Sequence, residues 1–148
     1  MTPLSLAYWT SIGLTITAPW AQAQTLCDNI NALADQTATS VPLPFSPNTV
    51  AACTRSRDLS GASSANCAWP HAYRSAEATA LFDGLLNAVA NCADQDIAPT
   101  IDQAVNHPDF YDLRIFTMNN VEVGLSIKDK GGLQKTYVFL RVTPASPK

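Results

Sequence analysis

Apolar residues recur at helical spacing in two stretches of the chain. In the first stretch, Leu26, Ile30 and Leu33 predict a short helix over residues 27–36. The second stretch predicts a longer helix from residue 75 to about residue 93, because its apolar side chains form one stripe and Ser75 is a suitable N-cap. The stripe consists of Leu81, Phe82, Leu85, Leu86, Val89 and Cys92.

Alternating apolar and polar residues predict strands in the rest of the chain. Residues 51–57 and 66–73 predict a hairpin, and three later stretches predict an antiparallel meander. Asn119 and Asn120 suit the first turn of the meander, because asparagine tolerates positive φ. The three stretches are residues 111–116, 121–128 and 136–142, with the second turn at residues 129–132.

Two segments between these elements are less regular. Residues 37–47 contain three prolines, which exclude a helix and favour an extended loop lying across the core over an exposed peptide-docking segment. Pro99 is a favoured first-turn residue and predicts a second short helix over residues 99–105.

Together the elements predict an α+β domain that is stapled by disulfides. An antiparallel sheet, made of the hairpin and the C-terminal three-strand meander, is covered on one face by helices. We expect a single domain over residues 24–143 and a flexible tail over residues 144–148, since a chain of this length suits one domain.

The first 23 residues contain no Asp, Glu, Lys or Arg. Their apolar block ends in Ala21-Gln22-Ala23, which is typical of a signal peptide cleaved before Gln24. The alternative is an uncleaved anchor, but polar residues interrupt the block and it is short for a hydrocarbon layer of about 30 Å. We therefore expect a periplasmic or secreted protein with no membrane span after cleavage.

The chain has four cysteines, none of which forms a Cys-x-x-Cys pair. In an exported protein such cysteines are expected to form disulfides. Cys53 and Cys67 face each other across the predicted hairpin, while Cys27 and Cys92 lie on the two predicted helices. We therefore predict the bonds Cys27–Cys92 and Cys53–Cys67. The alternative bond, Cys67–Cys92, would require the chain to run back along a helix about 27 Å long.

Neither charge nor motifs indicate nucleic-acid, metal or cofactor binding. The net charge is −3, whereas nucleic-acid binding needs a basic face. The two histidines, His71 and His107, lack the spacing of a metal site, and the Gly-x-Ser-x-Gly motif is absent. The charge is uneven, because six basic and four acidic residues give +2 from Asp109 onward and the rest of the chain carries −5.

The densest run of candidate binding residues is Trp69-Pro70-His71-Ala72-Tyr73-Arg74. Trp, Tyr and Arg dominate the energetics of protein interfaces, so Trp69, His71, Tyr73 and Arg74 form one candidate contact patch. The alternative places the aromatic residues in the core or at its edge and pairs Arg74 with Glu77 one helical turn away. This alternative is favoured, because large aromatic side chains are mostly buried in domains of this size.

A second candidate surface surrounds the last predicted turn, which Lys128, Lys130 and Lys135 flank. These lysines would bind an anionic partner, such as an acidic protein surface or a polyanionic envelope glycan. The alternative is a solvated hairpin tip whose lysines discourage edge-to-edge aggregation. The small size of the cluster and the presence of Asp129 within it favour this alternative.

We expect a non-enzymatic exported module that binds another envelope or extracellular protein, for example an inhibitor or immunity-type protein acting on an envelope enzyme. The alternative is a small envelope hydrolase with carboxylate or histidine chemistry that the sequence does not locate. An enzyme should have a cleft with converging titratable groups, whereas a binding module should expose an apolar or aromatic patch.

Overall fold

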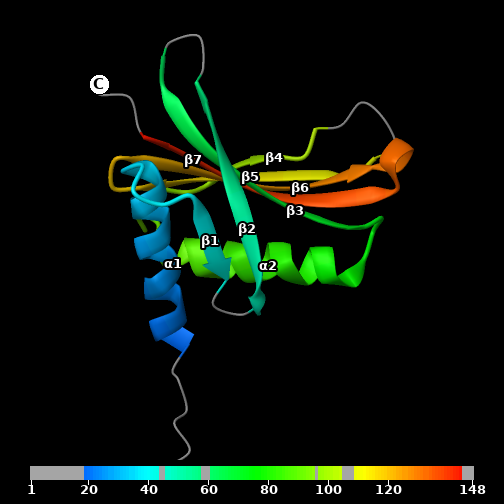
Figure 1. Ribbon diagram of the computed structural model, residues 1–148, viewed down its shortest axis with the longest axis horizontal. Coiled ribbons are helices and arrows are strands. Elements are labelled where there is room, and N and C mark those ends of the chain that lie inside the picture. Colours follow the sequence, from blue (N-terminus) through cyan, green and yellow to red (C-terminus); the bar gives the residue numbers. More distant parts are fainter. Residues whose placement is uncertain (1–18, 44–45, 58–60, 96, 105–108, 145–148) are drawn as a thin grey trace, which may run out of the picture.

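A computed structural model describes residues 19–43, 46–57, 61–95, 97–104 and 109–144 (Figure 1). Seven strands form one antiparallel sheet in the order β1-β2-β3-β7-β6-β5-β4, and two α-helices pack on it, which confirms the predicted α+β fold. The elements are α1 (Pro19–Ala34), β1 (Ser40–Leu43), β2 (Ser46–Arg57), β3 (Ser63–Ala72), α2 (Ala76–Ala90), β4 (Thr100–Asp102), β5 (Tyr111–Met118), β6 (Val121–Lys130), the 3₁₀ turn η1 (Gly131–Leu133) and β7 (Lys135–Pro144).

The core lies between the helices and one face of the sheet. Strands β6 and β7 alternate as their sequences predict, and every second side chain is buried against α1 and α2. Helix α2 begins after Ser75, whose side chain accepts a hydrogen bond from the Ala78 amide at 3.2 Å, as predicted for an N-cap. The buried sheet residues of these two strands are Val121, Val123, Leu125, Ile127, Asp129, Thr136, Val138, Leu140 and Val142.

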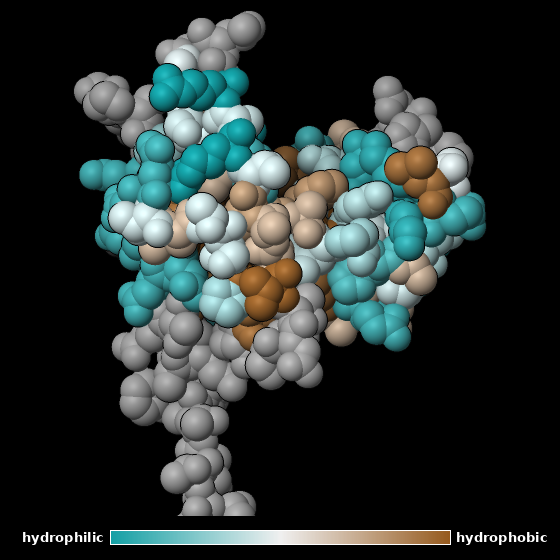
Figure 2. All heavy atoms as spheres, viewed as in Figure 1, coloured by the Kyte–Doolittle hydropathy of each residue, from teal (hydrophilic) through white to brown (hydrophobic). Residues whose placement is uncertain are grey.

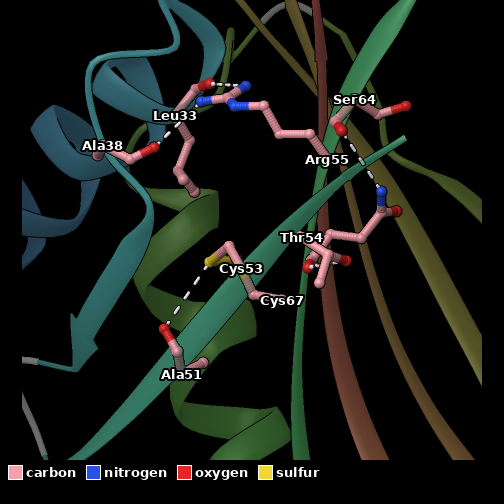
Figure 3. Close-up of a disulfide and its surroundings, with 9 residues drawn as sticks. Leu33, Ala38, Ala51, Cys53, Thr54, Arg55, Ser64 and Cys67 are labelled. Atoms are coloured by element: carbon pink, nitrogen blue, oxygen red, sulfur yellow. Dashed lines mark hydrogen bonds between the residues drawn. A yellow bond between two sulfur atoms is a disulfide. The ribbon is translucent and has the colours of Figure 1, made fainter. Parts of the chain in front are cut away.

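Both predicted disulfides are present, Cys27–Cys92 between the helices and Cys53–Cys67 across the β2–β3 hairpin. Figure 3 shows the second bond and the arginine beside it. The guanidinium of Arg55 donates to the backbone oxygens of Leu33 at 3.1 Å and Ala38 at 3.0 Å. Strand β2 is therefore tied both to β3 and to the end of α1.

Two of the less regular segments differ from their sequence predictions. The segment predicted as a loop contains edge strand β1, in which Val41 and Leu43 are buried and Pro42 is exposed. An edge strand tolerates proline because its outer N–H groups need no ladder partner. The short helix predicted over residues 99–105 is wrong, because residues 100–102 form β4 and pair with β5. Residues 105–108 lie outside the described part of the chain.

Helix α1 begins at Pro19, earlier than the start predicted at residue 27, and ends at Ala34. Its buried side chains Leu26, Ile30 and Leu33 are those that the sequence pattern assigned to the core. Among the described residues, we found no helix with both the length and the apolar character needed to cross a membrane. The two disulfides fit an oxidising compartment outside the cytosol.

Candidate functional site

The sheet face opposite the helices carries a mixed apolar and basic surface, which we call the open face. Because strand neighbours are in register, side chains from β3, β7, β6 and β5 line up in rows across it. The lysine row contains Ala72, Lys135 and Lys130; the tyrosine row contains Pro70, Tyr137, Lys128 and Tyr111; and the apolar row contains Ala68, Phe139, Ser126 and Leu113.

Aromatic and aliphatic side chains occupy the middle of the open face. Tyr137 and Phe139 stack with ring centroids 5.6 Å apart and an interplanar angle of 14°. Leu113 and Ile115 of β5 lie across β6 from them and are only partly buried. Figure 2, which has the view of Figure 1 with β2 in front, shows the side of the molecule that carries β1 and β2, where hydrophilic residues cover both ends and apolar residues gather between them. An apolar surface that the described helices do not cover is a feature of binding surfaces.

The three candidate lysines all lie on the open face, at the end of the sheet that contains η1. Lys130 and Lys135 are directly opposite each other in the β6–β7 ladder. Lys128 precedes Lys130 by one step on the same face, and its ammonium nitrogen lies 5.5 Å from the centroid of the Tyr111 ring. We refer to Lys128, Lys130 and Lys135 as the lysine end.

The structure places the two predicted surfaces beside each other, although they are far apart in sequence. Ala72 of β3 pairs with Lys135, so the chain leaves β3 at the lysine end and continues into Tyr73 and Arg74. The Arg74 guanidinium carbon lies 5.0 Å from the centroid of the Tyr73 ring. Trp69 and His71 of the same run point to the helix side instead, where Trp69 belongs to the core and His71 is half-buried.

A buried carboxylate joins the two runs. Asp129 is 2% exposed and accepts hydrogen bonds from the Thr136 hydroxyl at 2.6 Å and from Arg74 Nε at 2.8 Å. The Arg74 amide in turn donates to the Thr136 hydroxyl at 2.8 Å. Arg74 therefore has a bonding partner that its sequence neighbours did not indicate, and its left-handed φ of 53° directs the chain toward α2.

A second carboxylate shapes the turn. The Asp109 carboxylate accepts a hydrogen bond from the Gly131 amide at 3.2 Å. A Cβ atom at position 131 would lie 2.9 Å from the same carboxylate oxygen and 3.6 Å from the Tyr73 hydroxyl. A side chain at position 131 would therefore require the Asp109 carboxylate to shift, and the hydrogen bond to Gly131 holds η1 against the start of β5.

The charge states of this end follow from these contacts. The hydrogen bond that Arg74 donates to Asp129, with the charge interaction with Tyr73 adding, raises the pKa of Arg74, so the guanidinium stays charged. Burial, with Asp102 and Asp112 adding, raises the pKa of Tyr111, so its ring stays neutral beneath Lys128. Burial lowers the pKa of His71, which favours the neutral imidazole at pH 7.

One pocket among the described residues is lined by a single titratable side chain. A pocket of about 190 Å³ lies between the end of α2 and β5, and Asp94 is the titratable residue among those that line it. Its other lining residues are small, apolar or amide-bearing, including Ala90, Ala93, Gln95, Ile97 and Phe116. In the described ranges, no group of three or more His, Cys, Asp or Glu side chains is arranged to hold a metal ion.

Sequence reasoning missed the residues that organise this end of the sheet. Asp129 and Thr136 were assigned only to a turn and to a strand face, and the open-face side chains of β5 and β7 were not considered as a surface. One signal was available in the strand pattern. Asp129 and Thr136 fall on the buried face of their strands, opposite each other, and a buried carboxylate requires a hydrogen-bonding partner. We found no family model, curated protein or solved structure that matches this chain.

Proposed function

We propose that this chain is an exported, non-enzymatic binding module that contacts another envelope or extracellular protein through the open face of its sheet. An inhibitor or immunity-type protein that blocks an envelope enzyme is one concrete form of this function. The observation that carries the proposal is the partly buried apolar row beside the lysine end, in which Phe139 stacks on Tyr137 of the neighbouring row.

The composition of the surface supports a protein partner. Protein interfaces have an apolar core enriched in aromatic and arginine side chains, with a polar rim. The open face has this order, because Phe139, Leu113 and Ile115 lie centrally while the lysine end and Arg141 surround them. The disulfides and the continuous ladder hold these side chains on a rigid scaffold, which lowers the entropy lost on binding.

The test compares two variants of the disulfide-bonded protein in affinity capture from the native envelope, followed by binding kinetics with the captured protein. The double variant Leu113→Thr and Phe139→Thr removes apolar area from the open face and keeps residues that favour strands. The control, Ile101→Thr, removes a more exposed apolar side chain from the helix side of β4, where Ile101 is 54% exposed.

We expect wild type and Ile101→Thr to retain the same partner with the same affinity, and the double variant to lose it while keeping its melting temperature within a few degrees. A partner that the double variant retains at full affinity would contradict the proposal. So would the absence of any saturable partner for the wild-type protein.

A further inference from the structure

The lysine end brings like charges together without compensating them. Lys130 and Lys135 occupy directly opposite positions on one face of an antiparallel pair, an arrangement that destabilises a sheet. Lys128 adds a third positive charge one step along the same face. None of these three ammonium groups forms an ion pair with a carboxylate of the described residues.

The carboxylate nearest in sequence is oriented to the other side of the sheet. Asp129 lies between Lys128 and Lys130, but alternation directs it to the helix side, where Arg74 and Thr136 bind it. The turn therefore separates its charges, with the negative charge buried and paired and the positive charges facing outward. Such a surface attracts an anion from outside the chain.

The anion-attracting surface continues directly into an apolar one. Successive rows on the same face lie about 7 Å apart, because a strand advances about 3.3 Å per residue. The apolar row is therefore about 13 Å from the lysine row, with the tyrosine row between them. A polyanionic glycan would use the lysines but gains little from Phe139 and Leu113, whereas a polypeptide with acidic and apolar side chains uses both.

From this geometry we infer that the open face receives an extended acidic segment of a protein partner, with carboxylates at the lysine end and apolar side chains over Phe139 and Leu113. The inference rests on the proposed function and specifies the partner's surface. In an extended segment, alternate side chains point the same way, so an acidic residue and an apolar residue four positions later would meet the lysine and apolar rows.

The probe is a fluorescent peptide, Glu-Ser-Glu-Ser-Leu-Ser-Phe, titrated with the disulfide-bonded protein in a fluorescence anisotropy assay. The comparison ligands are the same peptide with Gln in place of Glu, the same peptide with Ser in place of Leu and Phe, and heparin as a sulfated glycan. The variant is Lys130→Gln with Lys135→Gln. The matched control is Arg57→Gln, which removes an exposed charge from the far end of β2.

We expect the acidic peptide to bind, and its affinity to fall about tenfold in the double lysine variant and on raising NaCl from about 0.05 to 0.3 M, since salt screens exposed charges. Arg57→Gln should bind as wild type, and both altered peptides should bind more weakly. The double lysine variant should melt no lower than wild type, because the substitution relieves repulsion.

Two results would overturn the inference. One is peptide affinity that is unchanged by the double lysine substitution or by replacing Glu with Gln. The other is heparin binding that is tighter than peptide binding and insensitive to Leu113→Thr with Phe139→Thr, which would assign the lysine end to a polyanionic glycan. Either result leaves the proposed function standing if the captured native partner still depends on Leu113 and Phe139.

Discussion

Arg74 Nε lies 2.8 Å from Asp129 Oδ2, a contact that joins the end of β3 to the turn between β6 and β7 across 55 residues of sequence. The Asp129 side chain is 3% exposed and that of Arg74 is 55% exposed. The same arginine therefore presents charge to solvent and stabilises a buried carboxylate. Its replacement should change stability as well as any binding surface at the lysine end.

The hydroxyl of Thr136 tests this buried network most directly, because it donates to Asp129 and accepts from the Arg74 amide. Thr136→Val keeps the shape but leaves buried polar groups without partners, which costs about 1–3 kcal/mol of unfolding free energy. We expect a melting temperature several degrees lower. Thr136→Ser keeps the hydroxyl and should lose much less. Equal losses for the two variants in thermal denaturation would show that the hydroxyl contributes nothing.

Arg74→Ala separates the structural role of this residue from a role in binding. The substitution leaves Asp129 with one fewer partner, so we expect a lower melting temperature, while alanine keeps the Cβ atom that arginine already places at φ 53°. Arg74→Gly removes the same ion pair but suits positive φ, and it should be the less destabilising of the two. Partner affinity measured well below both melting temperatures then reports the binding role, and equal affinity in all three proteins would assign Arg74 to structure alone.

The strands and the hairpin disulfide could be predicted because each depends on local pattern. Val123 and Leu140 lie in strands whose side chains alternate between buried and less buried positions, and Asn119 adopts the positive φ of 53° that its residue type favours in a tight turn. The disulfide between Cys53 and Cys67 followed from the length of one hairpin. In each case, residues close in sequence specified the geometry.

The edge strands and the buried network could not be predicted in the same way. Pro42 reads as a loop residue, and Thr100 becomes a strand residue only because Ile115 offers it a partner. Likewise, Arg74 has an equally plausible local partner in Glu77, and only the docking of β3 against β7 brings it to Asp129. Pairing over long sequence separations decides these features, and one sequence does not encode it locally.

The two disulfides should contribute unequally to stability. Cys27–Cys92 spans 65 residues and joins two helices, whereas Cys53–Cys67 spans 14 residues already paired in a hairpin. In the loop-entropy model, the first bond contributes about 4 kcal/mol and the second about 3 kcal/mol. We therefore expect Cys27→Ala with Cys92→Ala to unfold at lower denaturant than Cys53→Ala with Cys67→Ala. The reverse order in urea titrations would contradict the prediction.

Stability should fall on mild acidification because of His71. Burial lowers its pKa in the folded state below the ordinary value of 6.5, so the unfolded chain binds more protons in the interval between the two values. Stability is thus fully present above pH 6.5 and decreases as the pH falls below it. His71→Gln should flatten the pH dependence of urea unfolding in this interval. A slope that the substitution leaves unchanged would exclude His71 as the cause.

A second loss of stability at acidic pH should follow from protonation of Asp112. Hydrogen bonding to Arg114 lowers the pKa of this carboxyl below 3.8, with Gln103 adding a further bond. The stabilisation is present above pH 3.8 and is lost as the pH falls through the lowered pKa. Asp112→Asn should remove this component while leaving the His71 component in place. Unfolding curves of wild type and Asp112→Asn that stay parallel below pH 4 would contradict the assignment.

Cleavage of the leader remains a prediction, and the structure indicates how cleavage should affect the stability of the fold. A cut before Gln24 would remove residues 19–23 from the start of α1 but keep Cys27 and the buried Leu26, Ile30 and Leu33. The mature chain should therefore melt at nearly the same temperature as a chain that keeps the leader, because Leu26, Ile30, Leu33 and both disulfides are retained. Intact-mass measurement on exported protein checks the start at Gln24. A retained leader would contradict the cleavage prediction, and a large difference in melting temperature would show that residues before Gln24 contribute to the fold.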